Sequence, residues 1–462
     1  MAKNIEYCCS NCGYRIAKWA GQCPSCKEWN TFEETEKLAK VKSSNLNVNT
    51  SIHSSSVIKY GKKIKEIEIV ETDRFMTGIN EFDRTVGGGL VRDSVSILSA
   101  PPGAGKSTLC LQLANAFVKS GLTAVYASGE ESATQIKRRA ERLKLSHKDD
   151  IIVLDSASMD DVLKSIEKFE PDFCVIDSIQ TYSLRDFLPA RAGNPIQVME
   201  CATAMVNVAK NGKKPCAIFM IGQMTKDDEL ASVRSLEHLV DAVFKLEGSR
   251  DETLRMLTSE KNRFGATDET GFFNMTSNGL ETIDNPSEYF MIERPSPVAG
   301  TALTVLREGS RPVIVEIDAL TSRSFSQFPM RLSDTLKKDK VNILISILEQ
   351  KANYSMFDTN IVIAAAGGIK LTDPACSLAI LAAIVSSKVD KPIDDKTAFL
   401  ADVTLTGELR KLPDAERCIK ELNRMGFKTV YVANGQAINT NGMNIKVKKF
   451  HTIKETLNDV FK

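Results

Sequence analysis

The segment Ala100–Thr108, with the sequence APPGAGKST, constrains the fold more than any other part of the chain. It follows an apolar run, Ser94–Leu98, that we expect to be a buried strand, and it leads into a helical pattern over Lys106–Lys119. A strand, a glycine-rich loop with Gly-Lys-Ser and a helix together are the context of a P-loop. The loop's N–H groups and the positive end of the helix dipole bind a phosphate. The sequence therefore predicts a nucleotide-binding α/β core.

The polar residues of this loop have separate expected roles. Lys106 should reach the β- and γ-phosphates of ATP, and the Ser107 hydroxyl should bind Mg²⁺. The usual pattern opens with glycine, whereas this chain has Ala100; a methyl group is tolerated there if the backbone φ is negative. The alternative is a chance glycine-rich turn. The predicted nucleotide-binding residues of the loop are Ala100, Pro101, Pro102, Gly103, Ala104, Gly105, Lys106, Ser107 and Thr108.

Composition limits the class of protein. A length of 462 residues predicts about three domains. Lys and Arg number 60 against 59 acids, so any DNA site must be a local patch. No apolar run approaches the ~20 residues of a membrane span, and the N-terminus lacks the apolar core of a signal peptide. We therefore expect a cytoplasmic protein without a membrane contact.

Five of the eleven cysteines lie in the first 26 residues. Cys9 and Cys12 form one C-x-x-C pair, and Cys23 and Cys26 form a second pair ten residues later. Four thiolates in this spacing suit tetrahedral Zn²⁺, and metal binding would supply the folding energy of so small a unit. Cys8 could compete with Cys9 as a ligand, and a redox pair or unligated thiols are the alternative. The other six cysteines are scattered among apolar neighbours and should behave as small buried hydrophobes.

The rest of the chain divides into three parts. Residues 33–56 are polar and lack aromatic side chains, which predicts a flexible linker after a zinc unit of residues 1–32. Residues 57–286 alternate strand-like and helix-like runs, which predicts a mainly parallel sheet covered by helices. Residues 287–462 form a second α/β region. Expected strands are 125–127, 173–176, 216–221, 313–317 and 361–364, and expected helices are 132–145, 337–352, 375–387 and 414–425.

Three polar residues follow predicted strands of the core. Asp177 ends an apolar run, where an acid typically orients Mg²⁺ through water. Glu130 is expected to be the general base that polarises the attacking water, with Glu131 the alternative; a charge favouring the following helix dipole would explain either one without catalysis. Gln223 follows the run 216–221, and in RecA-type sheets a glutamine there senses the γ-phosphate and moves a DNA loop.

Two loops at the same sheet edge carry cations that could contact DNA phosphates. The candidates are Arg185 and Arg191 in the first loop and Lys226 and Arg234 in the second. Solvated loop charges are the alternative. A third cationic tip comprises Lys261, Asn262, Arg263, Phe264 and Gly265, which could reach a neighbouring subunit's ATP or contact DNA.

With these motifs together, the chain closely resembles the bacterial RadA/Sms family of DNA repair proteins over nearly its whole length. The four-cysteine unit, Ser128–Ser132, Asp177–Thr181 and above all Lys261–Gly265 resemble the family's own motifs. The resemblance implies an N-terminal zinc finger, a RecA-like P-loop ATPase core and a Lon-protease-like C-terminal α/β domain. It also implies a hexameric, DNA-dependent ATPase and helicase that acts in recombination, moving on single-stranded DNA and migrating branches. A RecA-type recombinase is an expected partner.

The chain departs from the family's pattern at Ala100, at Gln223, where the family usually has histidine, and in a shorter loop over residues 225–234. In the C-terminal region, Ala375 stands where a Lon-type peptidase has its nucleophilic serine, and Glu416 stands near the position of its lysine. We therefore expect a scaffold and not a protease. An ATP-gated binding module and an ATP-dependent peptidase are the competing function classes.

Overall fold

The structure is a computed structural model that describes residues 5–9, 15–16, 18–24, 27–36, 63, 74–223, 236–248, 253–292, 294–326 and 328–462. These residues divide into two compact units. The first takes the described residues of Met1–Glu247 with Ser259–Ala266 and Met275–Leu280, and the second takes those of Gly248–Thr258, Thr267–Asn274 and Glu281–Lys462. The domain boundaries expected at residues 32, 56 and 286 stay predictions.

The N-terminal residues form a small antiparallel sheet, in which β1 (Ile5–Cys9) lies between β2 (Arg15–Ile16) and β3 (Phe32–Glu36). Its core is correspondingly small, with Cys9, Cys23 and Phe32 as the buried apolar residues. Strand β3 includes the first four residues of the expected linker, and residues 37–56 lie outside the described part of the chain.

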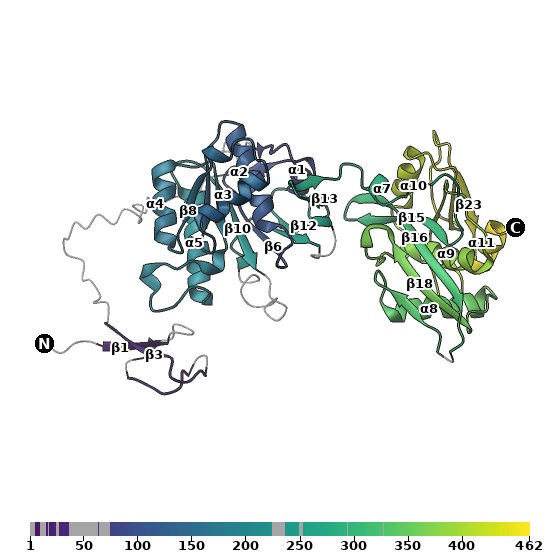
Figure 1. Cartoon of the computed structure of the whole chain (residues 1–462), viewed down its shortest axis with the longest axis horizontal. Helices are drawn as coiled ribbons and strands as arrows, with labels where there is room; N and C mark the ends of the chain where they lie inside the picture. Colours follow the sequence, from purple (N-terminus) through teal and green to yellow (C-terminus); the bar gives the residue numbers. More distant parts are fainter. Residues whose placement is uncertain are drawn as a thin grey trace. The chain divides into compact units, whose positions relative to one another are not determined.

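The nucleotide-binding core is a nine-stranded sheet in the order β14-β13-β12-β11-β6-β10-β9-β7-β8 (Figure 1). The run from β11 to β8 is parallel throughout, whereas β12 pairs antiparallel with β13. The mainly parallel α/β core is therefore confirmed, and an antiparallel edge extends it. The strands are β6 (Val95–Ala100), β7 (Ala124–Ser128), β8 (Ile152–Asp155), β9 (Phe173–Asp177), β10 (Ala217–Gln223), β11 (Ala242–Glu247), β12 (Leu254–Asn262), β13 (Thr270–Thr276) and β14 (Gly279–Thr282).

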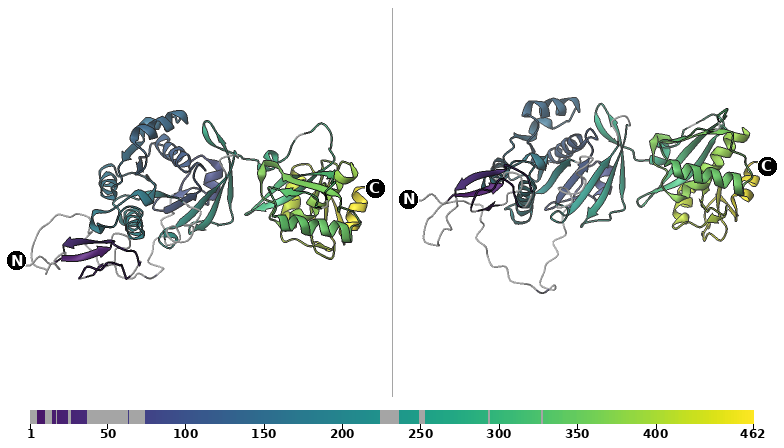
Figure 2. Two further views of the ribbon diagram at one scale, coloured as in Figure 1. Left: turned by 60° about the horizontal axis from the view of Figure 1, so that its bottom comes forward. Right: turned by 90° about the horizontal axis from the view of Figure 1, so that it is seen from below.

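Side chains on alternate strand positions bury both faces of this sheet, as a covered parallel sheet requires. On one face, Phe173 and Phe219 join Phe117 of α2 (Lys106–Lys119) in a chain of packed rings. On the other face, the intervening residues pack against α4 (Met159–Phe169) and α5 (Pro195–Asn211). Two further views show helices beside the strands of this core (Figure 2). Burial on both faces explains why these strands are continuous apolar runs.

Most element boundaries of the core match the expectation, and α2 matches it at both ends. The helix expected over residues 132–145 is α3 (Ala133–Arg142), which begins with the predicted capping box of Ser132 and Gln135. It ends early because Lys144 adopts a φ of 52° and the Leu145 N–H bonds back to the Ala140 carbonyl, which closes the last turn.

The second unit contains a mixed seven-stranded sheet in the order β17-β18-β16-β15-β19-β22-β23. Its expected strands lie within β16 and β18, and its expected helices correspond to α8, to η6 with α9, and to α10. The elements are β15 (Thr301–Glu308), β16 (Arg311–Arg323), β17 (Arg331–Ser333), α8 (Lys338–Lys351), β18 (Thr359–Ala365), η6 (Pro374–Cys376), α9 (Ser377–Val389), β19 (Thr397–Leu400), α10 (Ala415–Arg424), β22 (Thr429–Ala433), β23 (Lys446–Phe450) and α11 (Ile453–Val460).

Helix α9 is the central helix of this unit, because ten of its thirteen residues are buried. It packs on β15, β16 and β19. Even so, none of the helices in the described ranges is long and apolar enough to cross a membrane.

Candidate nucleotide site and its surroundings

The P-loop begins at the end of β6 and turns on two glycines. Gly103 and Gly105 have φ values of 83° and 110°, in the region where a side chain is strained. A Cβ on Gly105 would also lie 2.4 Å from the Met275 side chain. Ala100 is fully buried and does not have a positive φ, so its methyl group fits as expected. The loop thus delivers Lys106 and Ser107 to the first turn of α2.

The ammonium of Lys106 folds back over the loop, where Nζ donates to the carbonyl oxygens of Ala100 at 2.7 Å and Pro101 at 3.3 Å. Burial lowers the pKa of Lys106, and the nearby carboxylates of Asp177 and Glu130 partly offset that effect. The cation is therefore held by backbone oxygens next to two acids, in a position to exchange carbonyl contacts for phosphate oxygens.

Asp177 is the last residue of β9 and is almost fully buried. In the sheet, β10 lies between β9 and β6, the strand that leads into the P-loop. Burial raises the pKa of this carboxyl, while hydrogen bonds from Tyr126 and Ser107 lower it. The Tyr126 hydroxyl donates to Asp177 Oδ2 at 2.5 Å. A buried carboxylate beside a serine hydroxyl is an oxygen donor set that fits Mg²⁺, with Ser107 and Asp177 as the residues that would hold it.

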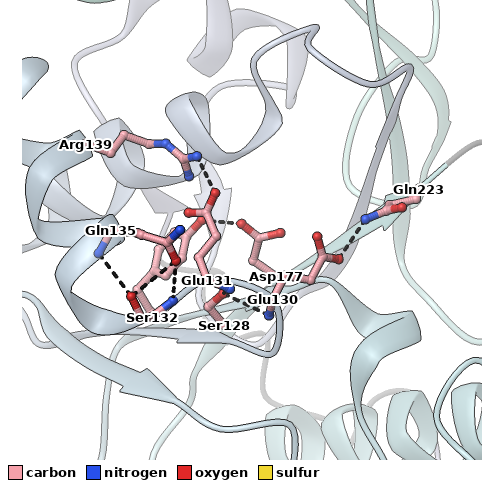
Figure 3. A network of polar contacts seen from close by, with 9 residues as sticks. Ser128, Glu130, Glu131, Ser132, Gln135, Arg139, Asp177 and Gln223 are labelled. Carbon is pink, nitrogen blue, oxygen red and sulfur yellow. Dashed lines mark hydrogen bonds and ion pairs between the residues drawn. The ribbon is translucent and has the colours of Figure 1, made fainter.

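The two acids after β7 have different surroundings (Figure 3). Glu130 Oε1 accepts hydrogen bonds from Ser178 Oγ at 2.6 Å and from Gln223 Nε2 at 2.7 Å. Glu131 instead forms an ion pair with Arg139 of α3 at 2.5 Å. Glu130 therefore faces the strand ends of β9 and β10, whereas the charge of Glu131 is neutralised by a structural partner.

The Lys261–Gly265 motif packs against Gly87, the first of three consecutive glycines, Gly87–Gly89. A Cβ on Gly265 would lie 3.0 Å from the Gly87 Cα, and a Cβ on Gly87 would lie 3.1 Å from the Gly265 Cα. Asn262 links the two segments, since its Nδ2 donates to the Val86 carbonyl at 3.1 Å and its Oδ1 accepts from the Phe264 N–H. Asn262 and Gly265 thus hold the backbone of the motif against Val86 and Gly87.

The two cations of the motif have partners in the same chain. Lys261 Nζ donates to the carbonyls of Glu237 and of Val240, the latter at 2.8 Å. Arg263 lies 3.4 Å from the buried carboxylate of Asp241 but stays 55% exposed. Burial and then the charge of Arg263 lower the pKa of Lys261. Among the described residues, no hydrogen bond or ion pair joins either cation to the P-loop of its own chain.

The candidate DNA loops are described only in part. Arg185 and Arg191 are exposed on the loop that follows Asp177. The buried side chain of Gln197 holds this loop by bonding the N–H and carbonyl of Leu184 and the carbonyl of Ala190. Lys226 and Arg234 lie outside the described residues.

The structure describes two of the four cysteines of the predicted metal site. Cys9 and Cys23 are fully buried, and Cys9 Sγ lies 3.1 Å from Thr31 Oγ1. Cys12 and Cys26 lie outside the described residues. So do Ser10, Asn11 and Ser25, which lie between the cysteines of the two pairs. One buried cysteine from each predicted C-x-x-C pair fits Zn²⁺ ligation. The six cysteines beyond this unit are all buried, as predicted.

In the second unit, Ala375 is buried beside Cys418 in a narrow cleft whose lining includes the Arg307–Asp373 pair. Glu416 is on α10 and pairs with Lys420 at 2.7 Å. Ser377 is buried, and its hydroxyl donates to Asp402. In strand β23, Lys448 forms an ion pair with Asp459 at 2.5 Å.

Comparison with known proteins agrees with this geometry. A rubredoxin metal binding domain matches residues 7–34, and an AAA domain matches residues 62–229. The RadA DNA repair protein of Bacillus subtilis is 38% identical over 433 residues, which covers 94% of this chain and 93% of the relative. Those of Streptococcus pyogenes and Haemophilus influenzae are 36% identical, over 99% and 94% of this chain respectively.

This chain belongs to the RadA family. The family resemblance inferred from the sequence motifs is thereby confirmed, together with the α/β ATPase-type core and the N-terminal metal-binding type of domain.

Several residues of the RadA-type site were missed by the sequence reasoning. Tyr126 lies inside an apolar strand, so its hydrogen bond to Asp177 had no local signal. Asp241 immediately precedes β11 and accepts from the Val95 N–H, Lys210 and Arg263. The run Gly87–Gly89 was visible as a triplet, and its positive φ values of 90°, 93° and 101° could have been suspected.

Proposed function

We propose that this protein is an ATP-driven DNA motor that moves on single-stranded DNA and promotes branch migration of recombination intermediates. The observation that carries the proposal is the joint position of Lys106, Asp177 and Glu130 at adjoining strand ends, with Gln223 bonded to Glu130. The RadA relatives are DNA repair proteins, which supports a function on DNA.

The catalytic roles follow from the surroundings of each side chain. Lys106 would bind the β- and γ-phosphates. Ser107 and Asp177 would hold Mg²⁺, which stabilises charge on the phosphate oxygens when bound. Glu130 would polarise the attacking water, since its carboxylate is held by neutral donors and not by a cation. Gln223 would respond to the γ-phosphate through its bond to Glu130.

A ring of subunits would complete the site. Among the described residues, Lys261 and Arg263 form no hydrogen bond or ion pair with their own P-loop, so we propose that they reach the site of a neighbouring subunit, as an arginine finger is supplied in trans. Six subunits are proposed from the family resemblance. Arg185, Arg191, Lys226 and Arg234 would face DNA in the channel.

The two flanking parts would have binding roles. Cys9, Cys12, Cys23 and Cys26 would hold structural Zn²⁺, whose binding would stabilise the small N-terminal sheet. The C-terminal unit, with Ala375 and Glu416 in place of a Ser–Lys pair, would act as a Lon-like scaffold for the ring and not as a protease. A RecA-type recombinase is the proposed protein partner on DNA.

The deciding experiment measures ATP hydrolysis with and without single-stranded DNA, for the wild type and for Lys106→Ala. We expect DNA to stimulate the wild type, and the variant to lose at least roughly 100-fold in rate, because an ammonium that stabilises transition-state charge is removed. The variant should retain the native mass of the wild type. Equal hydrolysis with and without DNA in the wild type would refute the motor.

The competing classes have separate readouts. A strand-displacement or branch-migration assay distinguishes a motor from an ATP-gated binding module, which would remodel no DNA and would instead retain a protein partner. Peptide cleavage by the wild type that persists in a variant substituted at Ala375 and Glu416 would favour a peptidase.

A further inference from the structure

Strand β10 extends beyond its last pair with β9 before it reaches the candidate site. Strand β9 pairs with β10 only as far as Ile176 and Met220, whereas β6 continues beside β10 to the pair Ala100 and Gln223. The backbone groups of Gln223 that face away from β6 therefore have no strand partner. Backbone groups that lose a strand partner are usually satisfied by a side chain or by water.

The side chain of Gln180 takes the place of the missing strand. Its Oε1 accepts from the Gln223 N–H, and its Nε2 donates to the Gln223 carbonyl, both at 3.4 Å. Gln180 lies in the short turn η3 (Ile179–Thr181), directly after Ser178. One amide group thus joins the end of β10 to the turn that leads into the loop with Arg185 and Arg191.

The same turn also reaches Glu130 from a second direction. Ser178 donates to the Glu130 oxygen that accepts from the Gln223 side chain. Gly129 lies so close to the turn that a Cβ there would be 2.2 Å from Thr181 Oγ1. A displacement of η3 would therefore move both donors that hold Glu130, of which Figure 3 shows Gln223.

We propose that Gln180 is a positioning residue that holds Gln223 against Glu130 and couples the loop after η3 to ATP hydrolysis. It acts through Gln223 and does not contact the nucleotide. This inference rests on the proposed function, because the signal that it would transmit is DNA bound to that loop.

The test uses Gln180→Met in the full-length protein, which keeps the side-chain length but removes both hydrogen bonds. Gln112→Met is the matched control, because Gln112 makes the same pair of bonds to the N–H and carbonyl of Leu280, at 3.0 and 2.9 Å, on α2 away from Glu130. The ratio of kcat with a poly(dT) oligonucleotide to kcat without it should fall about fivefold or more in Gln180→Met, the low end of a typical coupling between sites. It should stay at the wild-type value in Gln112→Met, and the two variants should have similar melting temperatures. Equal ratios in the two variants would overturn the coupling.

A second measurement separates this inference from the motor itself. Gln180→Met is combined with Gln223→Met, and kcat is measured without DNA. If Gln180 acts through Gln223, its substitution should lower kcat in the wild-type background and have little effect when Gln223 is already replaced. The same factor in both backgrounds would refute the positioning role. A wild type that DNA does not stimulate would refute the motor, and the cycle would still decide whether Gln180 positions Gln223.

Discussion

At the scale of single residues, the surroundings of Glu130 and Glu131 distinguish two acids that are neighbours in sequence. Glu130 is held by Ser178 and Gln223, both neutral, whereas Glu131 is paired with Arg139. The bond to Gln223 holds Glu130 at the end of β10, next to the predicted nucleotide site, whereas the ion pair with Arg139 ties Glu131 to α3.

We predict that Glu130→Gln lowers the rate of ATP hydrolysis roughly 10²- to 10⁴-fold, the usual contribution of a general base. Glu131→Gln is the matched control, with the same change one residue away. It should lose much less activity and should mainly lower the melting temperature, because Arg139 is left unpaired. Steady-state ATPase rates and thermal unfolding of both variants check this. A larger rate loss in Glu131→Gln would assign the base to Glu131.

Asp177 leads to a prediction about pH. Burial raises the pKa of its carboxyl above the value in the unfolded chain, so its ionisation costs stability as pH rises through the folded-state pKa. Without Mg²⁺ or nucleotide, Asp177→Asn should therefore melt at a higher temperature than the wild type at pH 7. This difference should disappear below the ordinary titration range of an aspartate.

The measurement is the melting temperature across that pH range, with and without Mg²⁺ and a nucleotide analogue. Ligands should stabilise the wild type more than the variant, because Asp177 would help to hold the metal. A wild type that is the more stable of the two at pH 7 without ligands would contradict the argument.

Residue types with local chemical signals were predictable, and those defined by distant neighbours were not. The strand, loop and helix around Lys106 and the acid at the end of β9 could be predicted from a few adjacent residues. The roles of Tyr126, Gln180 and Asp241 could not be predicted, because their partners are distant in sequence. Asp177 is 51 positions from Tyr126, Gln223 is 43 positions from Gln180, and Val95 is 146 positions from Asp241. Such contacts depend on strand order, which the sequence pattern leaves open.

At the scale of elements, the turn Gly87–Gly89 and the Lys261–Gly265 segment form one packed unit. Arg74 strengthens it, since its guanidinium donates to the Gly89 carbonyl at 3.1 Å and to the Phe264 carbonyl. The family motif is therefore held by a glycine turn that lies far earlier in the chain. The bond between Asn262 and Val86, for example, spans 176 positions.

Two alanine substitutions in this turn separate strain from packing. Gly88→Ala should cost about 1–2 kcal/mol, because its φ of 93° is strained for alanine although nothing lies within 4 Å of the new Cβ. Gly87→Ala has a similar φ and also brings a Cβ 3.1 Å from the Gly265 backbone, so it should cost at least about 1 kcal/mol more.

Urea unfolding of both variants gives the free energies, and ATPase rates give the effect on the motif. Gly87→Ala should lose hydrolysis as the Lys261–Gly265 segment is displaced, whereas Gly88→Ala should retain it. Equal losses of stability and activity in the two variants would show that packing of the two segments is unimportant.

At the scale of the whole molecule, the second unit has several large apolar side chains exposed near one edge of its sheet, where β17 is the last strand. Phe325 and Phe328 are 93% and 85% exposed on the segment that joins β16 to β17. Exposed apolar groups in this number usually mark an interaction surface. The exposed members are Leu320, Phe325, Phe328, Met330, Leu332 and Phe357.

If this surface assembles the proposed ring, the double variant Phe325→Ser with Phe328→Ser should have a lower native mass than the wild type, with an unchanged melting temperature of the isolated subunit. Leu405→Ser is the control, because Leu405 is 72% exposed on another segment. Light scattering coupled to gel filtration measures the mass. An unchanged mass in the double variant would exclude this surface from assembly.

The burial of the six cysteines beyond the N-terminal sheet has a practical consequence. Burial raises the pKa of each of these thiols, to about 12 for Cys174 and Cys201 and to about 11 for Cys418. Alkylating reagents attack thiolates, so the folded protein should offer them almost nothing outside the first 26 residues. The increase in covalent labelling on chelation would therefore report the cysteines released from the proposed zinc site, without any engineered cysteine-free background.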